Sequence, residues 1–225
     1  MTDVRFQRNC VRLIQMITYL DPVYPVIKGV PASSGSNSPM RKVTRQVAFA
    51  DDQAWDRERA TKVRALFDGM ASDWHTRSST ERQLPVLDAL DRGGAPNGLV
   101  LELGSGLGDK TALLTERLGP TVALDLAMEM LALAPLSSNR IHGDASQLPF
   151  PEGIATSVVL INALLFPAEV DRVLADGGAV VWVNTSGEHT PIHLSAEDLC
   201  EALPGPWTGV ASRAARGTWA VVRRS

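Results

Sequence analysis

The sequence predicts an α/β fold, in which a doubly wound and mostly parallel sheet ends in an antiparallel hairpin. Two observations carry this prediction. From residue 98 onward, apolar runs of strand length alternate with helical segments, which is typical of a parallel sheet covered on both faces. Near the C-terminus, only a short connection separates the strand-like runs WTGVASRA and GTWAVVRR. Such a connection favours a hairpin, and therefore an antiparallel end to the sheet.

Seven strands and six helices are expected along the chain. The first five strands cover 98–103, 121–125, 139–142, 156–162 and 178–184, and the two strands of the hairpin follow them. The helices between the strands are expected over 109–118, 127–134, 145–148 and 167–174. Two further helices precede the sheet, in the first half of 53–77 and over 81–93. Their apolar residues recur with the helical period, and a pair of glycines ends the second of them.

Composition and charge divide the chain into two parts. With 225 residues, 44% hydrophobic and 21% charged, it has the balance of an ordinary soluble domain with a sizeable core. Residues 1–49 carry a net charge of +5, which leaves −8 for the rest of the chain. The stretch GVPASSGSNSPM at 29–40 has the composition of a linker. We therefore expect a basic N-terminal extension and linker over 1–49 and one globular domain over 50–225.

The segment 4–20 is weakly amphipathic, with arginines interleaved among its apolar residues. It is compatible with a membrane-surface or transit-type helix, with a helix that docks on the domain, or with an extension upstream of a true start at Met40. Gln15 interrupts its apolar stretch, so it does not resemble a signal peptide.

Several classes of protein are disfavoured by composition. The longest apolar runs are too short to span a bilayer. Cys10 and Cys200 form no spaced cluster, which argues against a disulfide framework or a zinc site. A net charge of −3 gives no reason to expect nucleic acid. We expect a cytoplasmic protein with no stable membrane association.

The stretch LVLELGSGLGDK at 99–110 joins a strand to a helix through a turn with three glycines. Gly104 permits the tight turn, Gly106 allows a ligand to approach the backbone, and Gly108 allows close packing as the helix begins. The free N–H groups of the following helix favour a negative ligand group. The spacing is G-x-G-x-G, which differs from the G-x-G-x-x-G of dinucleotide-binding proteins.

Polar residues stand at the ends of four expected strands. Glu102 precedes the glycine turn, and Asp125 closes the next strand, where a carboxylate can accept hydrogen bonds from both hydroxyls of a ribose. Asp144 follows the third strand, where it can accept from an adenine amino group, and Asn162 ends the fourth. The carboxyl ends of parallel strands are where open α/β sheets bind ligands, so these residues in this order indicate a nucleotide-type site.

Four successive segments, LVLELGSGLG, VALDLAMEML, GDASQLPFPEG and VVLINALLF, resemble motifs of class I S-adenosylmethionine-dependent methyltransferases of the small-molecule, domain-11-like type. The resemblance covers about residues 60–225 and implies a Rossmann-like, seven-stranded sheet with S-adenosyl-L-methionine as methyl donor. It implies that Gly104 and Gly106 face the methionine part, Asp125 the ribose, and Asp144 with Ala145 the adenine. The full set of expected cofactor residues is Trp74, Glu102, Gly104, Ser105, Gly106, Gly108, Asp125, Leu126, Asp144, Ala145 and Asn162.

Two details qualify the resemblance. Members of the family commonly carry an Asp at the start of the fourth strand, where this chain has Thr156; that Asp is often structural. The stretch FDGMASDWHTR resembles the family's N-terminal cap over the cofactor, which is why Trp74 is included in the site.

The expected reaction is transfer of a methyl group to a small-molecule acceptor by in-line displacement. Such a reaction depends on alignment and exclusion of water, and a base is needed only when the acceptor must lose a proton early. His75 and His189 are the candidate bases. Pro191 lies between His189 and His193, so no metal site is expected. The alternative is a non-catalytic cofactor-binding or regulatory protein with the same fold, while the glycine spacing disfavours a dinucleotide-dependent oxidoreductase. The sequence indicates neither the acceptor nor an oligomeric state.

Overall fold

The structure is a computed structural model that describes residues 17–31, 34–50, 54–77, 79–136 and 139–225. Within these ranges eight strands form one sheet in the order β1-β7-β8-β6-β5-β2-β3-β4. The strands are β1 (Ile17–Tyr19), β2 (Val100–Leu103), β3 (Thr121–Asp125), β4 (Asn139–His142), β5 (Ala155–Ile161), β6 (Leu174–Asn184), β7 (Trp207–Ala214) and β8 (Gly217–Arg224).

The predicted fold class is confirmed. Strands β4, β3, β2, β5 and β6 run parallel to one another, and β8 is antiparallel to both β6 and β7. All seven expected strands are present, and the short strand β1 adds an eighth by pairing in parallel with β7 at the edge. The Ile, Thr and Tyr side chains of β1 favour an extended backbone, so the described end of the segment 4–20 is a strand and not a helix. Residues 4–16 of that segment lie outside the described residues.

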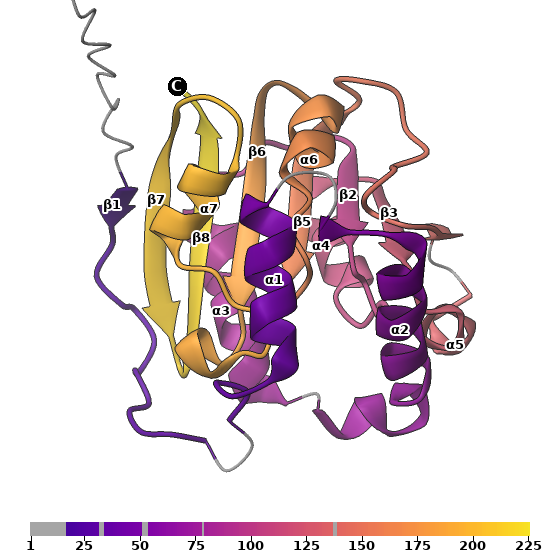
Figure 1. The fold of residues 1–225 in the computed structure, drawn as a ribbon. Coiled ribbons are helices and arrows are strands. Elements are labelled where there is room, and N and C mark those ends of the chain that lie inside the picture. The colour runs from indigo at the N-terminus through magenta and orange to yellow at the C-terminus, as the bar shows by residue number, and fades with distance from the viewer. Residues whose placement is uncertain (1–16, 32–33, 51–53, 78, 137–138) are drawn as a thin grey trace, which may run out of the picture.

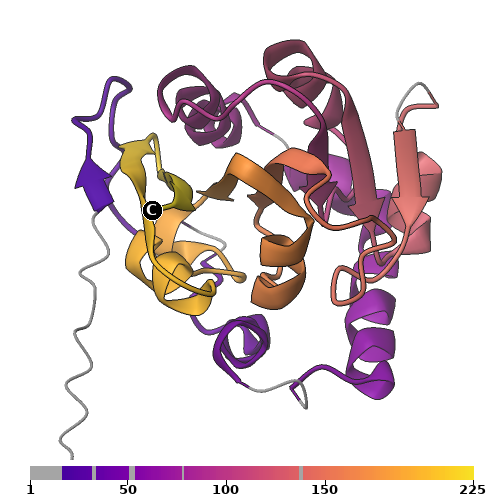
Figure 2. The same cartoon turned by 90° about the horizontal axis from the view of Figure 1, so that it is seen from above.

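Helices cover both faces of the sheet (Figures 1 and 2). They are α1 (Pro39–Phe49), α2 (Arg57–Asp68), α3 (Thr80–Arg92), α4 (Thr111–Leu118), α5 (Met128–Leu133), α6 (Pro167–Val173) and α7 (Ala196–Ala202), with short 3-10 helices η2 (Ala71–Arg77) and η3 (Gly187–His189). In the view of Figure 1, α1, α6 and α7 lie in front of the sheet, and α3 and α4 lie behind it.

Each central strand contributes to two apolar layers because successive side chains point to opposite faces. In β5, Val158 packs into the layer that includes Leu199 of α7, whereas Val159 packs into the layer that includes Leu114 of α4. All of these side chains are fully buried. The near-continuous apolar runs that predicted a parallel sheet therefore reflect burial on both faces.

The first described residues are attached to the rest of the fold. Backbone hydrogen bonds join β1 to β7, and Leu20 N–H donates to the carbonyl of Ala211 at 2.8 Å. On α1, Arg45 pairs with Asp198 at 3.1 Å. These contacts bring part of the expected extension onto the edge and front of the sheet, while the division at residue 49 stays a prediction.

The helices differ from the prediction in two places. The helix expected over 145–148 is a turn, because Asp144 accepts the N–H of Ser146 at 2.9 Å and Pro149 soon interrupts the backbone donors. Helices α1 and α7 were not predicted, although both carry readable start signals. Ser38 caps α1 just before a proline, and Ser195 forms a capping box with Asp198 at the start of α7.

Thr156, at the position where the family commonly has an Asp, has a structural contact in this chain. Its hydroxyl donates to the carbonyl of Leu99 at 2.9 Å, next to the start of β2. A Cβ at Gly98 would lie 2.6 Å from the Thr156 methyl group. The two strand starts are therefore packed closely, well away from the carboxyl edge of the sheet.

Candidate functional site

The glycine turn between β2 and α4 has the backbone that the sequence motif predicts. Gly104, Gly106 and Gly108 have φ values of +68°, +57° and +66°, which side chains rarely adopt. A Cβ at Gly104 would come within 2.7 Å of the Ala163 Cβ. Glycine is therefore required for this turn to lie against the loop after β5.

Asp125, at the end of β3, joins the glycine turn to the loop that follows its own strand. Its carboxylate accepts the N–H of Gly106 at 2.7 Å and the N–H of Ala127 at 2.7 Å. Burial raises the pKa of this carboxyl group, and the two backbone hydrogen bonds oppose that rise. Each carboxylate oxygen has a second lone pair, so the same group retains acceptor capacity for hydroxyl groups.

Asp144, after β4, is contacted by a residue that the sequence did not identify. The indole N–H of Trp55 approaches its two carboxylate oxygens at 2.9 and 3.2 Å, and Ser146 donates a backbone N–H at 2.9 Å. The Trp55 ring packs edge-on against Phe166, with 5.1 Å between ring centroids. A segment that precedes α2 thus covers the acid that was predicted to bind adenine.

Glu102 is a buried carboxyl group inside β2. The hydroxyl of Thr111, in the first turn of α4, donates to it at 2.5 Å. Burial raises its pKa to about 7, and the Thr111 hydrogen bond acts in the opposite direction. Near neutral pH, Glu102 is therefore a buried group whose charge a nearby cation would stabilise.

Asn162 follows β5 with a φ of +53°, an uncommon backbone for a residue other than glycine. Its side-chain oxygen accepts the N–H of Thr185 at 2.8 Å, and its amide donates to the Thr185 hydroxyl at 2.9 Å. Arg82 Nε donates to the same hydroxyl at 3.1 Å. Such outliers are held by their surroundings and cluster at functional sites, and here the polar contacts join β5, β6 and α3.

Two neighbouring cavities open along the carboxyl edge of the parallel strands, and both are lined by Trp74, Gly104, Gly106, Ile161 and Asn162. We call one the polar cavity. It has a volume of about 190 Å³ and is also lined by His75, Arg82, Glu102, Ser105, Leu107, Asp109, Lys110 and Thr185.

The other cavity, the aromatic cavity, has a volume of about 110 Å³. Its further lining residues are Trp55, Val63, Phe67, Leu124, Asp125, Leu126, Met130, Gly143, Asp144, Ala145, Ala163, Leu164, Phe166 and Ile192. Every expected cofactor residue except Gly108 therefore lines at least one of the two cavities. A Cβ at Gly108 would lie 3.1 Å from the Thr111 hydroxyl, so this glycine shapes the turn from outside the cavities.

The two candidate bases occupy different places. His75 lines the polar cavity, and its Nδ1 lies 3.0 Å from the carbonyl of Ser72. A carbonyl only accepts, so this contact assigns the proton to Nδ1 and leaves Nε2 as an acceptor. His189 lines neither cavity, because η3 places it beside the hydroxyls of Ser34 and Ser36, at 3.2 and 3.0 Å. Only His75 is placed to act on a ligand of the polar cavity.

Sequence reasoning missed Trp55, Phe166, Arg82, Lys110 and Thr185 as lining residues. Lys110 directly follows the glycine motif, and Phe166 ends the motif VVLINALLF, so both could have been noticed from their positions. Trp55, Arg82 and Thr185 come from segments that show no local pattern of a site. Among the described residues, no three His, Cys, Asp or Glu side chains form a group able to hold a metal ion. No helix in the described ranges has the length and apolarity to cross a bilayer.

The residues present fit S-adenosylmethionine. The Ser105 hydroxyl is buried beside the polar cavity and has no hydrogen-bond partner within the described part of the chain, which a ligand would correct. A Cβ at Gly106 would stand 3.6 Å from Trp74 Nε1, in the space where the two cavities meet. Of the acids near the strand ends, Glu102 lines the polar cavity together with Lys110, whereas Asp125 and Asp144 line the aromatic cavity.

Known proteins are similar to this chain over part of its length. Residues 101–182 match the model of a family described as a methyltransferase domain. Demethylmenaquinone methyltransferase of Lactococcus lactis is 30% identical over 162 residues, which are 61% of this chain and 64% of that protein. Malonyl-(acyl-carrier protein) O-methyltransferase of Marinomonas is 34% identical over 108 residues, 41% of this chain and 40% of that protein. The chain spans less than two thirds of the length of either relative.

Two solved structures share the fold. The complex of DhpI with SAH superposes with a TM-score of 0.58 at 21% identity, covering 72% of this chain and 94% of DhpI. A SAM-dependent methyltransferase from Aquifex aeolicus superposes with a TM-score of 0.55 at 17% identity, covering 68% of this chain and 96% of that protein. The family match over residues 101–182, these relatives and the shared fold therefore all make the chain similar to S-adenosylmethionine-dependent methyltransferases.

Proposed function

We propose that this protein transfers a methyl group from S-adenosylmethionine to a small-molecule acceptor. The observation that carries the proposal is the pair of cavities that meet at Gly106, one lined by acids suited to a nucleoside and the other by opposite charges suited to an amino acid. Both curated relatives named above are methyltransferases by name, which supports the same reading.

In this proposal the aromatic cavity holds the adenosine part. Asp125 would accept hydrogen bonds from the ribose hydroxyls, and Asp144 would accept from the adenine amino group. Leu126 and Ala145, next to these two acids, also line the cavity and would contact the nucleoside. The rings of Trp55 and Phe166 would cover the base on its apolar sides.

The polar cavity would hold the methionine part. Glu102 offers a carboxylate for the ammonium group, while Lys110 offers an ammonium for the carboxylate, and its own partner Asp109 lies at 2.7 Å. The Ser105 hydroxyl adds a donor or acceptor that is otherwise unpaired within the described residues. Opposite charges matched at both ends would fix the direction in which the ligand lies.

When bound, S-adenosylmethionine supplies a methyl group on a positively charged sulfur, which leaves with the electrons of its bond to that methyl group. The chain's own residues align the acceptor with this group and exclude water. His75 is the candidate general base: its Nε2 could accept a proton from an acceptor hydroxyl or amine in the polar cavity.

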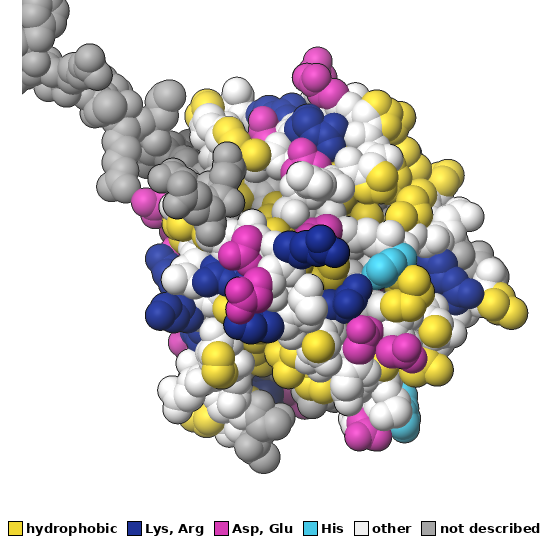
Figure 3. Space-filling view, turned by 45° about the vertical axis from the view of Figure 1, so that its right-hand side comes forward, with side chains coloured by type: hydrophobic (Ala, Val, Ile, Leu, Met, Phe, Trp, Pro, Cys, Tyr) yellow, Lys and Arg dark blue, Asp and Glu magenta, His cyan; other side chains and the backbone are white. Residues whose placement is uncertain are grey.

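The proposal also states that the acceptor is a small molecule and not a nucleic acid. On the described part of the face in Figure 3, Lys and Arg side chains are interspersed with Asp and Glu side chains, which supports a small acceptor over a nucleic acid. The cytoplasmic location, like the absence of a nucleic-acid partner, stays a prediction.

Calorimetry with S-adenosylhomocysteine, followed by incubation with methyl-labelled S-adenosylmethionine and a metabolite extract, tests the proposal. We expect S-adenosylhomocysteine to bind, NAD at millimolar concentration not to bind, and label to appear in a small-molecule product. Binding without any labelled product would favour the non-catalytic alternative. Tight NAD binding with no response to S-adenosylhomocysteine would overturn the proposal and the roles given to the acids.

A further inference from the structure

The polar cavity continues beyond the glycine turn to the carboxyl ends of β5 and β6, where Arg82 lines it. Arg82 stands in the first turn of α3 and donates its Nε–H to the Thr185 hydroxyl at 3.1 Å. That hydroxyl also receives the amide of Asn162 at 2.9 Å, and Thr185 N–H donates back to the Asn162 side chain at 2.8 Å. The bond from Nε holds one edge of the Arg82 guanidinium at the wall of the cavity, and the Asn162 contacts hold the Thr185 hydroxyl that accepts it.

The strand order separates Arg82 from the acids assigned to the cofactor. From one edge of the parallel strands, the order is β4, β3, β2, β5 and β6. The cofactor acids follow the same order, with Asp144 after β4, Asp125 at the end of β3 and Glu102 in β2. Arg82 is tied to Thr185, directly after β6. Arg82 therefore lies beyond the strands that carry the cofactor acids, on the side that remains for an acceptor.

The charges lining the cavity also divide in this way. At the glycine turn, Lys110 is paired with Asp109 at 2.7 Å, beside the buried Glu102. The polar lining residues from outside the glycine turn and its two flanking elements are Arg82, His75, Asn162 and Thr185, which include no carboxylate. A guanidinium binds carboxylate and phosphate-type oxygens better than it binds neutral groups.

Resting on the proposed function, we propose that the acceptor carries an anionic oxygen group, a carboxylate or a phosphate-type group, and that Arg82 binds it. Thr185 is a positioning residue in this site, because it orients the guanidinium through its hydroxyl. The anion would hold the acceptor against the methyl-donor end of the polar cavity, and its charge would exclude neutral analogues of the same shape.

Calorimetry on the full chain saturated with S-adenosylhomocysteine tests this assignment. Malonate, acetate and inorganic phosphate serve as anionic probes, and malonamide is the neutral counterpart of malonate. We expect at least one anion to bind, and malonate to bind about tenfold or more tightly than malonamide if malonate is that anion. Arg82→Gln should remove anion binding while S-adenosylhomocysteine affinity stays within about threefold of the wild type.

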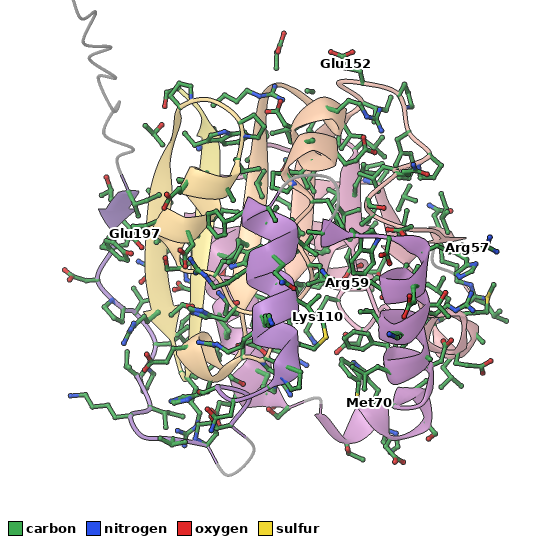
Figure 4. The ribbon with its side chains drawn as sticks, viewed as in Figure 1. Arg57, Arg59, Met70, Lys110, Glu152 and Glu197 are labelled. Carbon is green, nitrogen blue, oxygen red and sulfur yellow. The ribbon has the colours of Figure 1, made fainter. Side chains whose placement is uncertain are left out.

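Three further variants make the result specific. Arg57→Gln is the matched control, because Arg57 is exposed at the start of α2 and extends away from the molecule in Figure 4; it should change nothing. Arg82→Lys should restore part of the anion affinity, since it keeps the charge but loses the Nε–H group. Thr185→Val should weaken anion binding severalfold without loss of S-adenosylhomocysteine binding.

Each other outcome counts against the assignment. If the wild-type complex binds none of the anions, or if Arg82→Gln binds them as the wild type does, the anionic acceptor is wrong. If Arg82→Gln loses S-adenosylhomocysteine binding with an unchanged melting temperature, Arg82 belongs to the cofactor site instead. If the wild type fails to bind S-adenosylhomocysteine at all, the proposed function itself falls and this inference falls with it.

Discussion

The two cavities share the glycine turn but differ in how the chain builds them. Three charged side chains of the polar cavity, Glu102, Asp109 and Lys110, lie within one strand–turn–helix unit, and Arg82 adds a fourth from α3. The aromatic cavity is closed by Trp55, which reaches Asp144 from 89 residues away. Short-range segments therefore provide most of the charged groups, whereas long-range packing provides the cover. Substitutions at the shared turn, in each cavity and outside both separate these contributions.

Gly106→Val should have the largest effect, because Gly106 borders both cavities. A branched side chain would project toward Trp74 and strain a backbone with φ +57°. We expect at least about a hundredfold loss of S-adenosylhomocysteine affinity by calorimetry. Gly153→Val is the matched control, since Gly153 has φ +65° but no atom within 4 Å of a built Cβ. Normal binding by Gly106→Val would show that the turn does not face the cofactor.

Glu102→Gln tests the polar cavity through stability. The folded-state pKa of Glu102 is raised to about 7 from 4.5, so its contribution to stability is present below about pH 4.5 and lost as the pH rises through about 7. As the pH rises from 5 to 8, the free energy of unfolding of Glu102→Gln should increase relative to that of the wild type by on the order of 1–3 kcal/mol. Urea denaturation at both pH values measures this difference. A difference between the two proteins that does not change with pH would contradict the raised pKa.

Asp144→Ala tests the polar anchor of the aromatic cavity. Losing a charged acceptor for the adenine amino group should weaken S-adenosylhomocysteine binding roughly ten- to a hundredfold. Asp144→Asn keeps one acceptor oxygen and should lose less. Equal affinities for all three proteins would mean that the adenine is held by other groups.

Trp55→Phe is expected to have a smaller effect of the opposite sign. The indole N–H occupies the carboxylate that the adenine amino group needs, and phenylalanine keeps an aromatic ring without that donor. Binding should become about two- to fivefold tighter. Weaker binding would show that the Trp55–Asp144 hydrogen bond persists in the complex and supports the site.

Removal of residues 1–39 should have the smallest effect on binding. No residue of the described part of that segment lines either cavity, so a chain that begins at Met40 should bind S-adenosylhomocysteine within about twofold of the full chain. A large loss of affinity would show that the N-terminal segment supports the site. It would also contradict the expected division between 1–49 and 50–225.

The sequence by itself determined the sheet, the glycine turn and the acids at the strand ends. These features are local: burial on both faces makes each strand an apolar run, and a turn that needs positive φ needs glycine. For the same reason Asp125 and Asp144 could be placed by counting residues from the strands. The start signals of α1 and α7 were also local and could have been used.

Only the tertiary structure decided what covers the site and which polar groups meet in it. The hydrogen bond between Arg82 and Thr185 joins residues 103 positions apart, and that between Trp55 and Asp144 joins residues 89 positions apart. Neither pair belongs to one periodic pattern or one turn. The fold of the chain after β6 places His189 away from both cavities, although the sequence made it a candidate base. Such contacts depend on how whole elements pack, because side chains distant in sequence meet only once the sheet has brought their elements together.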